Sequence, residues 1–402
     1  MSRIEELIKE FCPDGVEYKK LVDTVTIERG KRVVREQLSP NGKYPVYQNS
    51  LTPLGFHTEY NNIANTTFII VAGAAGEIGY SDVAFWAADD CFTIVCPPSV
   101  INRYIYYALL RAQPQLLSKV RKASIPRLSR IAIENLIIPV PPMPVQREIV
   151  RILDNFAELT AELTAELTAR KKQYEYYRDT LLTFDVHRGG TFETKWRTLG
   201  EICDILTGYP FDSAQFKKSG VRLMRGMNIK RGGLVFDESI DRYWESSKGL
   251  EKYLLDAGDI VISMDGSLVG KSFGTVAKSD LPLLLVQRVA RIRAVQANQR
   301  YVYHYISCKF PHYVELKKTK GAIPHISQKD IANFQIAIPD VEVQNKIAEV
   351  LDNFDAICSD LNIGLPAEIE ARKKQYEYYR DMLLTFAAAD DIILTDRQTD
   401  RA

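Results

Sequence analysis

The sequence predicts an α+β protein in which two mixed α/β domains are separated by two long helices that pack antiparallel, as a pseudo-two-fold internal repeat. The clearest evidence is that ARKKQYEYYRDTLLTF at 169–184 returns at 371–386 with a single change, Thr180 to Met382. In addition, short apolar runs broken by Gly, Asn and Pro alternate with long stretches whose apolar residues recur every three or four positions. These two patterns are typical of strands and of helices, respectively.

The duplication extends over most of the chain. The aligned segments are VEYKKLVDTVTIERG (16–30) with TKWRTLGEICDILTG (194–208), SIPRLSRIAIENLIIPVPPMPVQ (124–146) with AIPHISQKDIANFQIAIPDVEVQ (322–344), and LDNF at 153 with LDNF at 351. The offset between the copies grows along the chain, so one ancestral unit was duplicated and the second copy has longer loops.

The repeat gives a domain organisation. We expect mixed α/β domains at 1–143 and 186–341, long helices at 144–185 and 342–386, and a flexible tail at 387–402. A helix of forty residues is about 60 Å long, so its apolar stripe needs a partner helix, and the two long helices supply one another. Gly364 and Pro366 lie inside the second helical pattern and predict a break or kink there.

Composition limits the class of protein. The chain has 402 residues, 46% of them hydrophobic, which is too long for one ordinary core. It contains no apolar run of about 18 residues, so no membrane span or signal peptide is expected and a cytoplasmic location is predicted. Six cysteines without a CxxC pair and five histidines without HExxH spacing predict neither a metal site nor disulfides.

Charge is sorted along the chain. The net charge is only +1, but both α/β blocks are net positive and both helical segments are net negative. This distribution suits a protein whose α/β domains meet a polyanion and whose helices meet other proteins.

Between LDNF and ARKKQ, the first helix contains AELTAELTAELT at 157–168, a four-residue repeat of good helix formers. Four residues rotate a helix by about 400° and advance it by about 6 Å, so each unit acts as a spacer. A low-complexity helical stretch without a special role is the alternative interpretation.

These features together resemble the specificity subunit of type I restriction-modification enzymes, in the subclass with a TAEL-repeat spacer. The resemblance spans the chain and depends on the spacer, on both QYEYYRD segments and on the repeated IPxxS and PxxxVQ motifs. The family usually has Glu-Gln where this chain has Val145-Gln146 and Val343-Gln344. The resemblance implies a non-catalytic subunit with two target-recognition domains that read a bipartite asymmetric site in double-stranded DNA.

The resemblance also implies the partners. Two methyltransferase subunits are expected to dock on the chain, and restriction subunits are expected to join through them. S-adenosylmethionine and ATP are expected on those partners, with no cofactor or metal on this chain. Two copies of one partner need two equivalent surfaces, which explains the repeated helical motif.

Tyr and Arg side chains of that motif are the candidate docking residues, because both are favoured interface anchors. The predicted set is Arg170, Lys171, Tyr174, Tyr177, Arg178, Arg372, Lys373, Tyr376, Tyr379 and Arg380. The alternative is that these tyrosines pack inside the protein and the charged residues are merely solvated.

The DNA-contacting candidates lie in two kinds of segment. A basic segment before the proline run occurs in both copies and is suited to phosphate contacts: Lys119, Arg121, Lys122, Arg127 and Arg130 in the first, and Lys317, Lys318, Lys320, His325 and Lys329 in the second. Base contacts are expected from Gln48, Asn49, Arg225 and Asn228, with Lys230 and Arg231 nearby, because Arg pairs with guanine and Asn or Gln with adenine. Ordinary solvated loops are the alternative.

An enzyme that acts on DNA is the rival class. The sequence contains no [DN]PP[YF] methyltransferase motif and no glycine motif after a strand that would bind a nucleotide cofactor. Glu-x-Lys pairs at Glu193/Lys195 and Glu315/Lys317 are too common in a highly charged chain to indicate a nuclease. No catalytic residue is therefore predicted. A third possibility is a coiled-coil scaffold that does not contact DNA.

Overall fold

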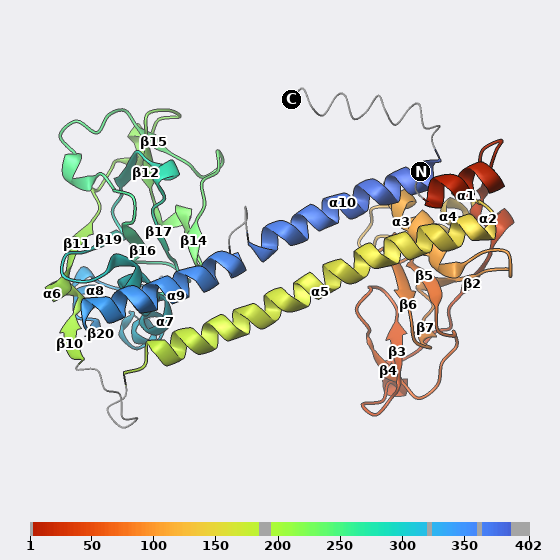
Figure 1. The fold of residues 1–402 in the computed structure, drawn as a ribbon, viewed down its shortest axis with the longest axis horizontal. Helices are drawn as coiled ribbons and strands as arrows, with labels where there is room; N and C mark the ends of the chain where they lie inside the picture. The colour runs from red at the N-terminus through yellow and green to blue at the C-terminus, as the bar shows by residue number, and fades with distance from the viewer. Residues whose placement is uncertain (1–2, 185–193, 320–323, 360–363, 387–402) are drawn as a thin grey trace. The chain divides into compact units, whose positions relative to one another are not determined.

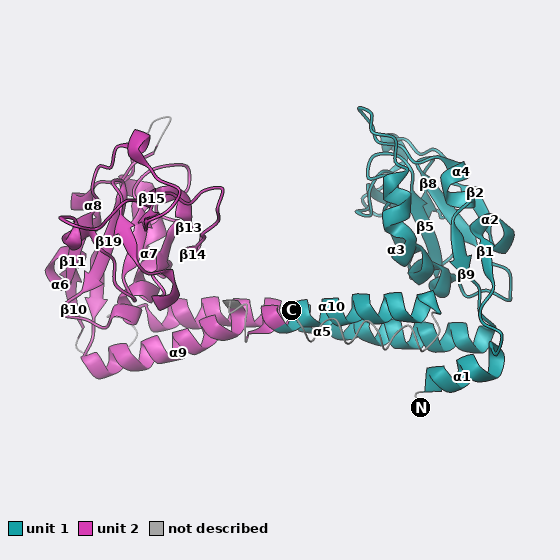
Figure 2. Ribbon diagram, turned by 90° about the horizontal axis from the view of Figure 1, so that it is seen from above, with its two compact units in different colours: residues 1–164, 368–402 teal, residues 165–367 magenta. Residues whose placement is uncertain are grey.

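The computed structural model describes residues 3–184, 194–319, 324–359 and 364–386. The chain divides into two compact units (Figures 1 and 2), the first containing residues 1–164 and 368–402 and the second containing residues 165–367. Each unit therefore joins one α/β domain to parts of both long-helix regions. The expected flexible tail at 387–402 lies outside the described residues.

The first unit contains a four-stranded antiparallel sheet with the strand order β2-β8-β5-β6. A three-stranded sheet, β4-β3-β7, combines an antiparallel and a parallel pair, and β1 pairs with β9. Strand β5 is buried along its whole length, as its run of Thr, Phe and Ile predicts. The strands are β1 Tyr18–Lys20, β2 Thr26–Arg29, β3 Tyr44–Tyr47, β4 Gly55–His57, β5 Thr66–Ile70, β6 Ile78–Ser81, β7 Trp86–Ala87, β8 Cys91–Val95 and β9 Ile137–Pro139.

The second unit repeats this topology strand by strand. Its sheets have the orders β11-β19-β16-β17, β15-β12-β18 and β10-β20, and a further hairpin, β13-β14, has no counterpart among the described strands of the first unit. The strands are β10 Lys195–Thr198, β11 Cys203–Thr207, β12 Val221–Met224, β13 Ile229–Lys230, β14 Gly233–Leu234, β15 Tyr243–Trp244, β16 Ile260–Ser263, β17 Phe273–Thr275, β18 Leu283–Leu285, β19 Val289–Ala294 and β20 Gln335–Ile338. The internal repeat and the α+β class are thus confirmed.

Helices complete both units. The shorter ones are α1 Arg3–Phe11, α2 Leu21–Thr24, α3 Asn102–Ser118, α4 Arg130–Glu134, α6 Leu199–Ile202, α7 Gln299–Lys317 and α8 Gln328–Ala332. The long ones are α5 Met143–Leu181, α9 Val341–Ser359 and α10 Leu365–Thr385. Gly364 is a bend and Pro366 lies in the first turn of α10, so the predicted break in the second helical region is confirmed. Within the described residues, no helix is both long and apolar enough to cross a membrane.

The long helices run antiparallel inside each unit. In the first unit, Leu153 near the start of α5 belongs to the same buried core as Leu384 at the end of α10. In the second unit, Leu182, just after α5, shares a core with Leu351 of α9. Each fully buried leucine stabilises the fold by about 1.5–3 kcal/mol. The helices are thereby fixed to the α/β domains by apolar packing.

A buried glutamine connects the start of each long helix to the α/β domain. The side-chain oxygen of Gln146 accepts a hydrogen bond from the Ile101 amide, directly before α3, at 2.9 Å, and its nitrogen donates to the Pro141 carbonyl at 2.8 Å. Gln344 makes the same two bonds, with the Asn298 amide at 2.9 Å and the Pro339 carbonyl at 2.8 Å. This is the structural role of the repeated Val-Gln pair.

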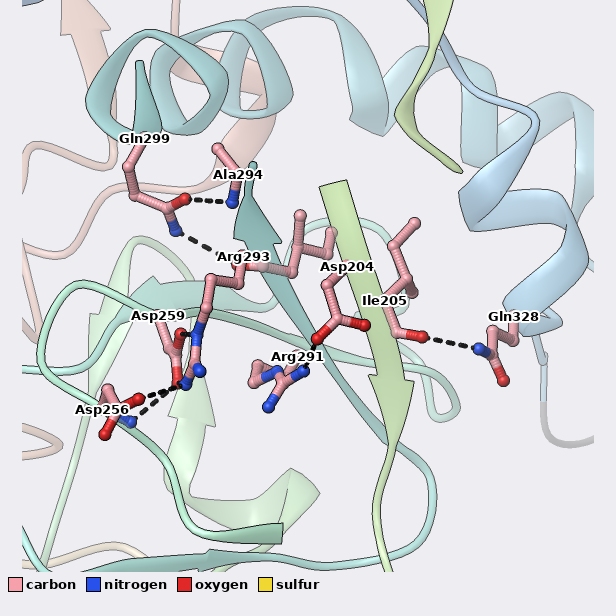
Figure 3. Close-up of polar contacts among 10 residues, drawn as sticks. Asp204, Ile205, Asp256, Asp259, Arg291, Arg293, Ala294, Gln299 and Gln328 are labelled. Carbon is pink, nitrogen blue, oxygen red and sulfur yellow. Dashed lines mark hydrogen bonds and ion pairs between the residues drawn. The ribbon is translucent and has the colours of Figure 1, made fainter. Parts of the chain in front are cut away.

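The second domain also contains a charged network on its four-stranded sheet (Figure 3). Arg293 pairs with Asp259 and with Asp256, each at 2.7 Å, and Arg291 pairs with Asp204. Arg291 is only 5% exposed, so this pair is largely buried at the arginine end. Removing one partner of a buried pair costs more than the pair contributes, because it leaves an uncompensated charge.

Candidate nucleic-acid interface and helical docking motifs

In the first domain, three loops converge, and two of them contain the predicted DNA-contacting residues. The amide of Gly73, after β5, donates to the Pro126 carbonyl in the basic loop at 3.1 Å. The amide of Ala74 donates to the Asn49 carbonyl, after β3, at 2.9 Å. The Gly-rich loop thus connects the base-reading candidates to the phosphate-binding candidates.

Gly73 is required for this convergence. Its φ is +81°, and a Cβ atom at this position would lie 2.8 Å from the Asn49 carbonyl oxygen. Only glycine combines a left-handed backbone with so close an approach. The sequence VAGAAGEIG therefore encodes the approach of the loops, in addition to joining β5 to β6.

The second domain builds the same arrangement with different side chains. The amide of Gly266, whose φ is +96°, donates to the Pro324 carbonyl at 3.0 Å. Asp265 and His325 form an isolated bridge, as Ala72 and Arg127 do in the first domain. Arg225 lines the same cleft as Asp265 and Gly266. Two candidate segments again come together through the loop after the central strand.

The basic loop of the first domain presents most of its predicted residues to solvent. The amide of Arg121 donates to the Arg127 carbonyl at 2.8 Å, which closes the loop and leaves both side chains exposed, together with Lys122 and Lys119. Arg130 differs, because its guanidinium bonds Glu134 at 2.6 Å and the Ile27 carbonyl at 3.1 Å. Arg130 thus has an intramolecular role, and the other four cations remain free to meet phosphates.

In the second domain the basic loop is closed by Thr319, whose amide donates to the His325 carbonyl at 3.0 Å. Lys317 and Lys329 are exposed, whereas Lys318 pairs with Glu315 at 2.7 Å. Lys320 lies outside the described residues. This loop therefore presents fewer free cations than its counterpart, among the residues that the structure describes.

The base-reading candidates are placed very differently from one another. Gln48 is half-buried and Asn49 is exposed, but Asn228 is completely buried. The Asn228 amide donates to Asp241 at 2.9 Å and to the Val235 carbonyl at 3.1 Å. Its side chain is used to hold the loop, and burial argues against Asn228 as a base-contacting residue.

Lys230 and Arg231 lie at the β13-β14 hairpin, and neither lines the cleft that contains Arg225 and Asp265. Arg231 and Gly232 line a different cavity, of about 490 Å³, together with Tyr174, Arg178 and Lys271. The structure thus groups Arg231 with the helical docking motif of α5.

The inner face of each docking motif packs within its own unit. Tyr177 stacks on Phe354 with ring centroids 5.5 Å apart, and Tyr379 stacks on Phe156 at 5.2 Å. Arg178 lies over the ring of Tyr174 at 5.6 Å, and Arg380 lies over Tyr376 at 5.8 Å. These side chains anchor the helices, as the intramolecular interpretation predicts.

The first tyrosine of each motif faces a polar cluster on α3 or α7. The hydroxyl of Tyr174 lies 3.4 Å from Nδ1 of His304, whose Nε2 lies 2.7 Å from Asp352. In the first unit, Tyr376 packs against Tyr107, whose hydroxyl donates to Asp154 at 2.5 Å. Burial raises the pKa of Tyr376 to about 12, so its phenol stays neutral.

The outer face of each motif contains a tyrosine that was absent from the predicted docking set. Tyr176 is 67% exposed and Tyr378 is 55% exposed, whereas Tyr379 is half-buried against Phe156 and Tyr177, which stacks on Phe354, is 39% exposed. Helical periodicity contained the signal: positions 174, 177 and 181 share one face, so position 176 must point elsewhere. Lys171 and Lys373 are exposed as well. Arg170 and Arg372 are half-buried, and each pairs with a glutamate one turn earlier on its helix.

Known proteins share these features. A family profile described as the type I restriction modification DNA specificity domain matches residues 13–170 and 193–371. The chain is 33% identical over 316 residues to the specificity subunit of type I restriction enzyme EcoR124I/EcoR124II of Escherichia coli, covering 72% of each protein. It is 24% identical over 408 residues to the type I restriction enzyme MjaVIII specificity subunit of Methanocaldococcus jannaschii, covering 92% of this chain and 94% of that protein.

Solved structures show the same fold. The S subunit of a type I restriction-modification system from M. genitalium superposes with a TM-score of 0.63 at 16% identity, over 92% of this chain and 96% of that one. A chain from a structure on complex assembly and conformational transition of the type I R-M system gives 0.58 at 18% identity, over 92% and 98%.

A duplicated α/β domain combined with a duplicated helical motif defines the class of protein. The family match at both copies makes the assignment specific. The chain belongs to the family of type I restriction-modification DNA specificity proteins.

Proposed function

We propose that this chain is the non-catalytic DNA sequence-recognition subunit of a type I restriction-modification complex. Each α/β domain reads one half of a bipartite, asymmetric target in double-stranded DNA. The duplication carries the proposal, because the same three-loop arrangement is built twice with different side chains, while the helical motif is kept nearly identical.

The contrast between loops and helices supports this division of work. Loops that read two different half-sites need different side chains on one scaffold, since base edges are distinguished by hydrogen-bonding groups. Exposed cations in the basic loops, such as Arg121, Lys122 and Lys317, are suited to phosphates, which set register and affinity but not sequence.

The helical motifs serve the protein partners. Two methyltransferase subunits dock on the outer faces around Tyr176 and Tyr378, and restriction subunits join through them. Matching exposure of these two tyrosines supports equivalent surfaces for two copies of one partner. In this proposal, S-adenosylmethionine and ATP are bound by the partners, and the chemistry takes place there.

Methylation mapping tests the proposal. The chain is co-expressed with its methyltransferase in a host that lacks other adenine or cytosine methylation of the same kind, and the genome is mapped at base resolution. We expect one motif with two specified half-sites and an unspecified gap. A continuous motif, or methylation that does not depend on this chain, would contradict the proposal.

A further inference from the structure

The second domain has an open cleft of about 520 Å³ at the point where its three loops meet. Its lining includes Phe211, Arg225, Asp265, Val286, Gln287 and Arg288. Arg225, Gln287 and Arg288 contribute hydrogen-bond donors to this lining, and Phe211 and Val286 contribute apolar surface. Such a lining suits the edge of a base better than it suits a phosphate, which favours exposed cations alone.

Arg288 lies in a backbone conformation that arginine rarely adopts. Its φ is +66°, in a turn where the Val289 amide donates to the Val286 carbonyl at 3.2 Å. Glycine or asparagine is the usual residue at the left-handed position of such a turn. Such positions persist only where the surrounding structure holds them in place, and they are enriched at functional sites.

The side chain of Arg288 is oriented from one side. Its Nη1 atom lies 3.3 Å from Oδ2 of Asp265, which is 27% exposed, whereas the arginine side chain is 60% exposed. The carboxylate restricts the planar guanidinium while most of its surface stays open to a ligand. An arginine restricted in this way presents its donors as a fixed fork, which matches the O6 and N7 acceptors of guanine.

The other arginine of the cleft is already engaged. Arg225 donates to the Ile240 carbonyl at 3.2 Å, and its guanidinium lies 5.4 Å from the centre of the Phe216 ring. Its contacts position the cleft wall. Arg288 is the more accessible of the two, because its side chain is 60% exposed whereas Arg225 is half-buried.

The first domain has the opposite charge at the equivalent position. The amide of Val71 donates to the Asp90 carbonyl at 2.8 Å, as that of Met264 donates to the Arg288 carbonyl at 2.9 Å. Asp90 has no left-handed backbone, because the described non-glycine residues with positive φ are Asn65, Arg288 and Phe386. One backbone position thus presents a cation in one domain and a carboxylate in the other, as two different half-sites require.

We propose that Arg288, oriented by Asp265, is a specificity-determining residue that donates to O6 and N7 of a guanine in the half-site read by the second domain. Asp265 acts as a positioning residue and does not touch the base. This inference rests on the proposed function and adds the identity of one base and of the residue that reads it.

The test uses the complete complex of this chain with its methyltransferase. Genome-wide methylation is mapped for the wild type and for Arg288→Gly, which removes the guanidinium and relieves the left-handed backbone, so the variant keeps its fold. We expect discrimination for guanine to fall roughly 5- to 150-fold at one position of one half-site, with every other position unchanged. Arg288→Lys is expected not to restore it, because lysine lacks the fork.

Two further variants separate the roles. Asp265→Asn is expected to weaken discrimination at the same position and at no other. Arg197→Ala, on strand β10 of the two-stranded β10-β20 sheet, is the matched control and is expected to leave the motif unchanged.

Each outcome decides a different question. If Arg288→Gly weakens binding equally for all sequences and reduces its salt dependence, Arg288 contacts a phosphate and the inference is wrong. An unchanged motif would also overturn it, as would loss of the motif together with a lower melting temperature than the wild type. If the wild-type complex gives no bipartite motif, the proposed function itself has failed, independently of Arg288.

Discussion

The ring of Phe156 stacks on the ring of Tyr379, with centroids 5.2 Å apart and an interplanar angle of 22°. Phe156 belongs to the first LDNF segment, and Tyr379 to the second QYEYYRD segment. Phe354 and Tyr177 form the reciprocal pair in the other unit, at 5.5 Å and 27°. Each unit is therefore completed by a motif from the other repeat, and neither repeat contains all of its own core.

This exchange predicts the behaviour of half of the chain. A fragment of residues 1–185 keeps the first domain and α5 but lacks Leu383 and Leu384, each of which contributes about 1.5–3 kcal/mol of burial. Its own copy of the motif can fill that site on a second fragment. We expect a dimer in light scattering at micromolar concentration.

A shorter fragment provides the control for that experiment. Residues 1–168 retain the spacer but lose the motif, so we expect no dimer and a less stable domain. A folded monomer of residues 1–185 would show that the exchange is not needed.

Tyr176 and Tyr378 provide a second prediction. Truncating an exposed interface tyrosine typically costs about 2 kcal/mol or more when it is an anchor, roughly thirtyfold in Kd. We expect Tyr176→Ala and Tyr378→Ala each to weaken the binding of one methyltransferase subunit, and the double variant to weaken both. Native mass spectrometry of the complex measures the number bound. If the double variant binds as many methyltransferase subunits as the wild type, with the same affinity, these tyrosines are not part of the docking surface.

The spacer gives a third prediction. Helix α5 is continuous through the repeat, and its threonine hydroxyls bond the carbonyls one turn earlier, with Thr164 donating to Thr160 at 2.7 Å. Deleting residues 164–167 removes about 6 Å and about 40° beyond a full turn. We expect the methylated motif to keep both half-sites while its gap shortens by about one base pair. Replacing the same four residues by alanines preserves length and is expected to preserve the gap.

A fourth prediction concerns acid stability. Burial alone raises the pKa of Asp352, but the hydrogen bonds and charges of His304 and Arg300 outweigh it and lower the pKa from 3.8 to about 2. A carboxyl group with a lowered folded-state pKa stabilises the protein above its unfolded pKa and loses this effect as the pH falls. The contribution of Asp352 should be complete above about pH 4 and vanish toward pH 2.

The size of that effect is reduced by solvent, because the Asp352 side chain is 35% exposed. We expect about 1 kcal/mol of the unfolding free energy to depend on it. Unfolding free energies measured between pH 5 and pH 2 should fall less steeply for Asp352→Asn than for the wild type. If the unfolding free energies of the two proteins fall equally steeply with pH, Asp352 is not the origin of the pH dependence.

The buried Gln146 gives a fifth prediction. Replacement by alanine leaves the Ile101 amide and the Pro141 carbonyl without partners, at a cost of about 2–4 kcal/mol. Denaturant unfolding should show this loss, and Gln115→Ala, an exposed position on α3, should change stability by less than about 0.5 kcal/mol. A loss at Gln146 no larger than at Gln115 would mean that water replaces the two bonds.

Sequence patterns predicted which segments form the long helices and where the second is interrupted, because periodicity and the effect of proline are local properties. Periodicity did not reveal, however, which candidates of the docking set also pack within their own unit. Tyr174, Tyr376 and Tyr379 pack against the cores of the units, whereas Tyr177 stacks on Phe354 and stays 39% exposed. Tertiary packing decides which face of a helix a domain covers. Asn228 is a second case that the sequence could not reveal, because only the packed loop shows that its side-chain amide donates a hydrogen bond to Asp241.

The sequence by itself determined that the protein is duplicated, that its repeated surface is helical, and that its basic loops occur in pairs. Repeated segments and the distribution of charge can be recognised from the order of the residues alone. Only the tertiary structure decided which repeat completes which core, and that Arg288, Asp265 and the loop of Arg225 share one cleft. Those relationships join residues far apart in the chain, and they depend on packing that minimises exposed apolar surface over a whole unit.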